Sequence, residues 1–249
     1  RVVGRAFFVP QRAAASRRGP VGRTIDRINQ GLIESGAQPP WIYTRSECAD
    51  FWATRTNDSA SNRPEQYAHK QDGIVRLLHG FWAPEVGPDS RVLEIGCNCG
   101  ANLNALRALG YGALQGVEIN PDAVRQMARS FPGLERSVTV HLGHMAEVLP
   151  SLADGAADVV FTMGVSMHIH PKDNPLFAQM ARVASAYVCT VEPELANSNY
   201  VFARDYGRVF ARLGLAEVRS LKVTAAEHPQ AVGYSGCTIR LFRVGARRP

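Results

Sequence analysis

The sequence predicts an α/β protein built on a doubly wound, mostly parallel sheet. The apolar run 91–95 leads through a glycine-bearing loop, 96–100, into residues 101–109, whose leucines recur at helical spacing. Apolar runs and helical segments then alternate along the chain, which is typical of parallel βαβ units. In such folds a ligand lies at the carboxyl ends of the strands, beside the first strand–turn–helix unit.

The composition fits one domain of this kind. The chain has 249 residues, of which 45% are hydrophobic and 20% charged, enough for a single core. No apolar run approaches the roughly 20 residues that span a bilayer, so we expect no membrane partner. A formal net charge of +6 permits anionic partners, including nucleic acid, but does not identify a site.

The five cysteines are odd in number and scattered, which argues against a disulfide framework and favours a reducing cytoplasm. Cys97 and Cys99 form a Cys-x-Cys pair, but no second Cys/His pair lies nearby at zinc spacing. We therefore expect no metal site, and interpret both as small side chains in a crowded loop.

The first 40 residues differ from the rest, because they are rich in arginine and contain only Asp26 and Glu34 as acids. Such a start is compatible with a transit peptide, with a flexible or partner-ordered arm, or with part of a lid over a site. Residues 24–33 have helical spacing, and Gly36 with Pro39-Pro40 would end that helix. We predict a basic arm with one short helix, and assign residues 1–63 to this extension and 64–249 to the main domain.

The main domain begins with a helix, because Pro64 suits a first helical turn. The apolar face of that helix is predicted at Tyr67, Ile74, Leu77 and Leu78. Including the first run, seven strands are predicted, at 91–95, 114–119, 137–142, 158–164, 186–191, 216–223 and 237–244, the last two as a hairpin-like pair. Further helices are predicted at 101–109, 122–130, 174–184 and 202–213.

Two predicted strands end in a carboxylate, Glu94 and Glu118. An ionised carboxylate only accepts hydrogen bonds and has two oxygens, so Glu118 could accept both ribose hydroxyls of an adenosine. The alternative for Glu118 is a solvated acid at a strand end.

At these residues the chain resembles the class I S-adenosylmethionine-dependent methyltransferases. Their first motif is acid-x-Gly-x-Gly-x-Gly, and here it reads Glu94-Ile95-Gly96-Cys97-Asn98-Cys99-Gly100, with Asn98 in place of the middle glycine. Residues 93–106 and 116–121 look closest to the branch of pseudaminic-acid-biosynthesis-associated methylases and type 11–12 methyltransferases. The resemblance runs from about Asp50 to the C-terminus. It implies a Rossmann-like seven-stranded sheet with its last strand antiparallel, and S-adenosylmethionine as cofactor with S-adenosylhomocysteine as product.

The resemblance also implies which residues bind the cofactor. Glycines let the backbone approach the ligand closely, and Asn98 tolerates a left-handed conformation better than most residues. His144 stands where the family often has an adenine-binding aspartate, which leaves the reading of adenine to the backbone groups of Met145 and Ala146. Tyr67 and Met145 could equally be core residues. The implied cofactor-binding set is Arg63, Tyr67, Glu94, Gly96, Cys97, Asn98, Gly100, Asn102, Glu118, Ile119, His144, Met145, Ala146, Met163 and Gly164, with Asn62 as a further candidate.

Residues 164–171 resemble the family's Gly-Val-x-x-His-Ile-x-Pro segment. His168 is the candidate catalytic residue, because imidazole titrates near neutrality and could serve as a general base. The alternative is a histidine that shapes the pocket. Pro171 restricts His170 to an extended backbone, so His170 is expected to point to a loop. Candidate acceptor-binding residues follow the fifth strand at Glu192, Glu194, Asn197, Asn199 and Tyr200, although a solvated loop would have the same composition.

The sequence therefore predicts methyl transfer to an oxygen or nitrogen of a small polar metabolite, such as a sugar or specialised metabolite. Most of the rate should come from aligning nucleophile, methyl group and sulfur. The first alternative is an RNA or protein methyltransferase that uses the arginine-rich arm, although no RNA-binding module is evident. The second is a non-catalytic cofactor-binding partner protein. A dinucleotide-dependent dehydrogenase fits less well, because Gly-x-Gly-x-x-Gly does not match residues 96–101. The oligomeric state stays open.

Overall fold

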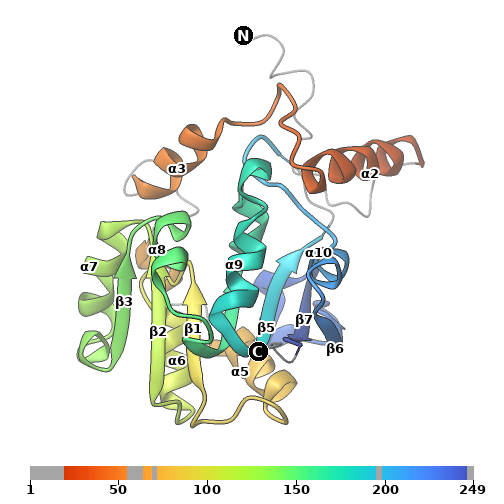
Figure 1. Cartoon of the computed structure of the whole chain (residues 1–249). Helices are drawn as coiled ribbons and strands as arrows, with labels where there is room; N and C mark the ends of the chain where they lie inside the picture. Colours follow the sequence, from red (N-terminus) through yellow and green to blue (C-terminus); the bar gives the residue numbers. More distant parts are fainter. Residues whose placement is uncertain (1–19, 55–63, 69–71, 195–197, 246–249) are drawn as a thin grey trace.

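The computed structural model describes residues 20–54, 64–68, 72–194 and 198–245 (Figure 1). One seven-stranded sheet forms the centre, in the order β3-β2-β1-β4-β5-β7-β6. The strands are β1 (Arg91–Ile95), β2 (Ala113–Glu118), β3 (Val138–Leu142), β4 (Ala157–Met163), β5 (Ala184–Pro193), β6 (Ala216–Lys222) and β7 (Cys237–Arg243). β1 to β5 pair in parallel, and β7 lies antiparallel between β5 and β6. The predicted fold class is confirmed.

The strand order reverses between β1 and β4, since the chain first moves outward through β2 and β3 and then returns to β4 on the other side. Ile95, the last residue of β1, is in register with Val117 of β2 and with Thr162 of β4. These three strands therefore end at nearly the same level. In open α/β sheets a crevice for ligands opens at such a reversal.

Helices cover both faces of the sheet (Figure 1). Alternate strand residues point to opposite faces, so Val92 joins one core cluster and Leu93 the other. The first cluster packs beneath α5 (Asp72–Trp82), α6 (Ala101–Ala108) and α7 (Pro121–Ser130). The second packs beneath α8 (Met145–Ser151), α9 (Leu176–Val183) and α10 (Tyr206–Arg212). Short 3-10 helices lie at η2 (Leu134–Arg136), η3 (Ser166–His168), η4 (Pro171–Asp173) and η5 (Pro229–Tyr234).

The single helix expected from Pro64 onward is two helices, α4 (Pro64–Tyr67) and α5, with residues 69–71 outside the described part. Close packing fixes where α5 lies. A Cβ added at Gly73 would stand 1.8 Å from the carbonyl oxygen of Gln230, so α5 approaches η5 at backbone distance. That approach is possible only because residue 73 has no side chain.

Residues 20–54, here called the N-terminal cap, lie over the end of the sheet (Figure 1). The helix expected at 24–33 is present as α2 (Pro20–Glu34), and a second helix, α3 (Arg45–Ala53), was not predicted. Thr44 begins α3 with a capping box: its hydroxyl accepts from the Glu47 N–H, and the Glu47 carboxylate accepts from the Thr44 N–H. No helix among the described residues is long and apolar enough to cross a membrane.

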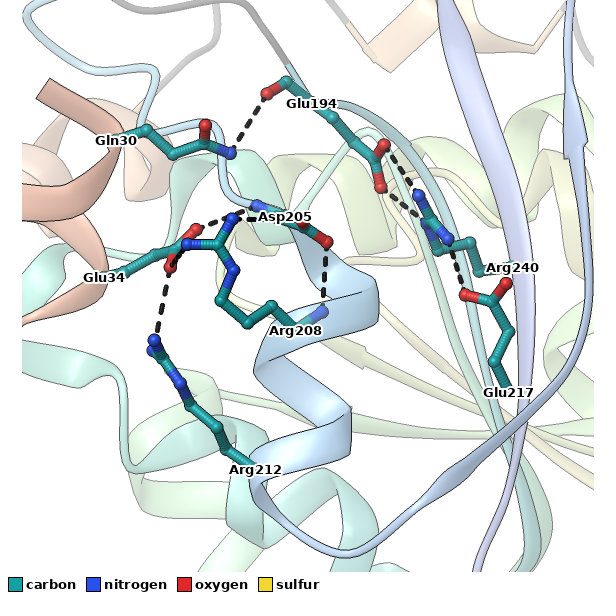
Figure 2. Close-up of polar contacts among 8 residues, drawn as sticks. All are labelled: Gln30, Glu34, Glu194, Asp205, Arg208, Arg212, Glu217 and Arg240. Carbon is teal, nitrogen blue, oxygen red and sulfur yellow. Dashed lines mark hydrogen bonds and ion pairs between the residues drawn. The ribbon is translucent and has the colours of Figure 1, made fainter. Parts of the chain in front are cut away.

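Polar contacts fix α2 to the main domain (Figure 2). The nearly buried carboxylate of Glu34 accepts from the Asp205 N–H at 3.1 Å and pairs with Arg208 and Arg212 of α10, at 3.4 and 3.6 Å. The Asn174 amide donates to the last carbonyls of α2, those of Ile33 and Glu34. These contacts hold the cap on α10 and beside η4.

Candidate functional site

A cavity of about 140 Å³ opens at the strand reversal, under the N-terminal cap. Its first side, here called the loop wall, consists of lining residues within 96–102, 117–120, 143–145 and 163–164, which end or follow β1, β2, β3 and β4. Its second side, the cap wall, consists of lining residues within 45–52 and 165–176. The loop wall is therefore built by neighbouring strand ends, whereas the cap wall joins segments far apart in the chain.

Most residues predicted from the sequence line this cavity: Tyr67, Gly96, Cys97, Asn98, Asn102, Glu118, Ile119, His144, Met145, Met163, Gly164 and His168. Glu94, Gly100 and Ala146 do not line it directly, and Arg63 and Asn62 lie outside the described residues. Gly100 instead precedes α6 in a left-handed conformation and packs against Met127 and Leu134.

Glu118 links the two loops at the centre of the loop wall. One carboxylate oxygen accepts from the Asn98 N–H at 2.7 Å, and the other accepts from the Asn120 N–H at 2.8 Å. Burial raises the pKa of Glu118, while these amide donors oppose the shift. Each oxygen has a second lone pair, so the carboxylate can bind further donors in the cavity.

The bend after β1 is shaped by positive φ angles at Gly96 (75°), Asn98 (49°) and Gly100 (75°). Among the described residues, Asn98 is the single non-glycine with a positive φ, and its side-chain oxygen accepts from the next N–H, that of Cys99. A Cβ at Gly96 would meet Val165 Cγ2 at 2.5 Å, so the bend can pack there only with glycine. The missing middle glycine of the motif is thus replaced by a residue that adopts the same left-handed backbone.

Behind the bend, Glu94 is 1% exposed, and its Oε1 accepts from the Asn102 amide at 2.6 Å. Glu94 Oε2 and Asn102 Oδ1 have no hydrogen-bond partner among the described residues. Burial raises the pKa of Glu94 to about 8, and the charge of Glu118 adds to the shift. Two buried acceptors without donors, one on a cavity-lining residue, are suited to a cationic or N–H-bearing ligand group.

The loop after β3 leads into α8, and a side chain of this loop, His144, caps that helix. His144 Nδ1 accepts from the Ala146 N–H at 3.0 Å and so caps α8. This hydrogen bond occupies the N–H of Ala146, one of the backbone groups that we expected to read adenine. His144 and Met145 themselves line the cavity.

His168 stands on the cap wall at the end of η3. Its Nδ1 lies 2.9 Å from the Tyr200 carbonyl, which can only accept, so Nδ1 carries the proton and Nε2 is the unprotonated nitrogen. Burial lowers the pKa of His168 to about 4, so the ring is neutral at pH 7. The ring centroid lies 4.3 Å from that of Trp52 and 5.9 Å from that of Tyr200. The side chain is thus a neutral imidazole of fixed tautomer with an acceptor nitrogen.

The cap wall depends on Glu192, for which we expected a role in acceptor binding. Glu192 is instead fully buried, and its carboxylate accepts from the N–H groups of Val165, Ser166 and Met167 at 2.9–3.3 Å. Burial raises its pKa to about 7. This carboxylate holds the turn that presents His168 and does not line the cavity.

The other candidates after β5 also have structural contacts. Glu194 binds Arg240, the Asn199 carbonyl accepts from the Tyr43 N–H, and Asn197 lies outside the described residues. Tyr200 contacts the site through its ring, which stacks on His168. Among the described members of this group, Tyr200 alone therefore has a side-chain contact to a cavity residue in this structure.

Sequence reasoning missed the residues that α3 contributes, Arg45, Cys48, Ala49 and Trp52. Arg45 Nε pairs with Asp173 at 2.8 Å, although 128 residues separate them in the chain. His170 was expected to point to a loop, but it is 2% exposed and lines the cavity. The only local signal for α3 was the Thr44-x-x-Glu47 capping box, and nothing in the sequence paired this helix with η4.

Comparison with known proteins finds one family that is similar to the central part of the chain. Residues 92–186 match the family described as "Methyltransferase domain". No curated protein sequence matches the chain. Among the described residues, no group of three or more His, Cys, Asp or Glu side chains could hold a metal ion.

Several solved methyltransferase structures are similar to this chain. Magnesium protoporphyrin IX methyltransferase from Synechocystis PCC 6803 has a TM-score of 0.57 at 13% identity, covering 80% of this chain and 100% of that one. Geranyl diphosphate methyltransferase has a TM-score of 0.58 at 13% identity, covering 80% and 98%. A SAM-dependent methyltransferase from Aquifex aeolicus has a TM-score of 0.51 at 13% identity, covering 81% and 98%. At this identity the likeness shows the fold, and the family match covers residues 92–186 of the predicted methyltransferase domain.

Proposed function

We propose that this chain is a methyltransferase that uses S-adenosylmethionine to methylate an oxygen or nitrogen atom of a small polar metabolite. The observation that carries the proposal is the loop wall: the Glu118 carboxylate and a glycine-lined bend lie at adjoining strand ends, with unpaired acceptors behind them. Two of the similar structures contain cofactor-type ligands, S-adenosylhomocysteine in one and sinefungin in the other.

The residues present fit the cofactor's chemistry. Glu118 would accept the ribose hydroxyls, because both of its oxygens face a cavity-lining loop and only accept. Glu94 and Asn102 have unpaired oxygens suited to an ammonium group. Ile119 and Met145 offer apolar surface for adenine, and Met163 and Gly164 border the space for the methionine portion. Tyr67 also lines the cavity, and Arg63 stays a candidate for the same end of the ligand.

Bound S-adenosylmethionine supplies a methyl group on a sulfonium, whose leaving group is a neutral thioether. The protein's task is to hold an acceptor atom in line with that bond in a partly dehydrated cleft. For a hydroxyl acceptor, His168 Nε2 would take the proton as the oxygen–carbon bond forms, with Nδ1 held by the Tyr200 carbonyl. An amine acceptor needs only to arrive uncharged.

The cap is part of the proposed site. We assign residues 1–63 to an extension of the methyltransferase domain, and its described portion, residues 20–54, contributes α3 to the cavity. The acceptor would bind between the cap wall and the donor. Sugars and specialised metabolites are the first acceptors to test, since the finer sequence resemblance is to the pseudaminic-acid-associated branch.

The test begins with calorimetric titration of the full chain with S-adenosylmethionine and S-adenosylhomocysteine. We expect one site per chain for both. Methyl transfer is then followed with a radiolabelled methyl group over fractionated small-molecule extract. Absence of S-adenosylhomocysteine binding would overturn the proposal.

The alternatives predict different results in the same experiments. Tight cofactor binding without transfer to any fraction would favour a non-catalytic binding protein. Transfer to RNA, with an affinity that falls steeply as salt rises, would favour the arginine-rich arm as a nucleic-acid contact.

A further inference from the structure

We propose that the acceptor is a small ring-bearing acid, and that Arg45 binds its anionic group while Trp52 packs against its ring. This inference rests on the proposed function and specifies the substrate class of the same site. It is drawn from the cap wall, whose residues have no role in the proposed binding of S-adenosylmethionine.

The two walls divide the cavity by chemistry. The groups suited to an adenosyl donor, Glu94, Asn102 and Glu118, come from β1, α6 and β2. The cap wall instead carries Arg45, Trp52, His168, His170 and Asp173. Because His168, the candidate base, stands on the cap wall, the methyl acceptor should lie along this second wall.

Arg45 is the single lysine or arginine among the described residues that line the cavity. Its Nε contacts both oxygens of Asp173, at 2.8 and 3.0 Å, and its Nη1 and Nη2 make no hydrogen bond within the described part of the chain. Asp173 is only 8% exposed, so it fixes one edge of the guanidinium, while the Arg45 side chain stays 57% exposed. A planar guanidinium held in this way presents its Nη edge to a carboxylate or phosphate.

Trp52 supplies a flat surface to the cavity from the same helix as Arg45, α3. Its indole centroid lies 4.3 Å from that of the His168 ring at a 53° tilt, and Phe51 packs edge-on against it at 5.0 Å. Its Nε1–H is buried and has no partner among the described residues. A ring with a polar substituent would gain both a packing surface and a hydrogen-bond donor from this side chain.

The competing assignment is that Arg45 binds the carboxylate of the donor itself. Asp173 ties Arg45 to η4, on the same segment as His168 and His170. The unpaired oxygens suited to the amino-acid end of S-adenosylmethionine belong to Asn102, on the loop wall, and to Glu94 behind it. These positions favour the assignment of Arg45 to the methyl acceptor. S-adenosylhomocysteine carries the same carboxylate as S-adenosylmethionine, so its affinity for Arg45 variants separates the two assignments.

The experiment uses the full chain with and without saturating S-adenosylhomocysteine, and three probes that share a phenyl ring: benzoate, phenyl phosphate and benzamide. Binding is followed by tryptophan fluorescence and calorimetry. We expect one of the anions to bind at least about tenfold more tightly than neutral benzamide, equivalent to about 1.4 kcal/mol. The preferred anion identifies a carboxylate or a phosphate.

The variants test the residue. Arg45→Gln should abolish the preference for the anion, Arg45→Lys should retain part of it, and both should leave S-adenosylhomocysteine affinity within about twofold of the unaltered chain. Arg125→Gln, which removes an exposed arginine from α7 outside the cavity, is the charge-matched control.

Three results would overturn the inference: equal or absent binding of the three probes, a preference that persists in Arg45→Gln, or a tenfold loss of S-adenosylhomocysteine affinity in that variant. The third result would assign Arg45 to the donor. Failure of the unaltered chain to bind S-adenosylhomocysteine would instead contradict the proposed function. That titration contains no probe, so its result is distinct from the three results above.

Discussion

The two walls of the cavity differ in how they are built. The loop wall comes from consecutive strand ends. Its Glu118 carboxylate accepts from the Asn98 N–H, which lies only 20 residues earlier in the chain. The cap wall depends on contacts between distant segments, such as Arg45 with Asp173 across 128 residues. Each wall nevertheless has a buried carboxylate behind it, Glu94 in the first and Glu192 in the second. On the proposed assignment, neighbouring strand ends therefore form the site for S-adenosylmethionine, and contacts between distant segments form the site for the methyl acceptor.

The proposed difference between the walls requires that the loop wall binds S-adenosylmethionine. The largest loss of cofactor affinity is therefore expected for substitution of Glu118. Glu118→Ala should weaken S-adenosylhomocysteine binding by more than about 100-fold, because hydrogen bonds to a charged group contribute roughly 1.5–3 kcal/mol each. The substitution also releases the Asn98 and Asn120 N–H groups. Calorimetry measures the change, with Glu147→Gln on the exposed side of α8 as the control. Unchanged affinity would refute the ribose role.

His168 tests the cap wall. With a hydroxyl acceptor, His168→Asn should lower kcat by about 100-fold, the lower range for a lost general base, and leave S-adenosylhomocysteine affinity within about threefold. Because its pKa is about 4, the ring should stay neutral from pH 6 to 8, and the wild-type rate should show no histidine titration there. Retention of kcat in His168→Asn, measured by methyl transfer, would make this residue a structural part of the pocket.

The buried carboxylates predict how stability depends on pH. The folded-state pKa values of Glu94 and Glu192, about 8 and about 7, lie above their unfolded values near 4.5. The folded state then binds more protons between these limits, so stability should fall as pH rises from 5 to 8, by at most about 1.4 kcal/mol per pH unit for each group.

Urea unfolding at several pH values measures this slope in the ligand-free chain. Glu94→Gln should reduce the slope and leave the part that comes from Glu192. An identical slope in this variant would show that Glu94 keeps an ordinary pKa.

The smallest effect is expected where α2 meets α10. Glu34→Gln weakens the pairing with Arg208 and Arg212 and should lower Tm by a few degrees, equivalent to about 1 kcal/mol, with donor affinity unchanged. The exposed pair Glu135–Arg136 offers the control, since Glu135→Gln should leave Tm nearly constant. Weaker binding of S-adenosylhomocysteine by Glu34→Gln would show that the attachment of the cap affects the loop wall.

The same contrast explains what the sequence could predict. The seven strands, the left-handed residue at Asn98 and the position of Glu118 all follow from local patterns, because strand ends and turns carry their own residue preferences. The cap wall has no such pattern. Arg204 is fully buried and donates to the carbonyls of Phe202 and Ile169, although arginine in a sequence normally indicates surface. Glu192 was assigned to acceptor binding because the sequence does not reveal its partners, the N–H groups of residues 165–167, which lie on another segment.

The five cysteines are all buried and free, and they divide between the two parts of the molecule. Cys48 belongs to α3, whereas the other four lie on β5, on β7 or in the bend after β1. Burial raises the thiol pKa of Cys48 to about 12, so it should react with a maleimide only after exposure to solvent. Lifting of the cap alone would then add at most three labels, at Cys48 and at Cys97 and Cys99, which line the cavity beneath it, and unfolding of the sheet would add all five. The mass of the labelled chain distinguishes these two openings directly.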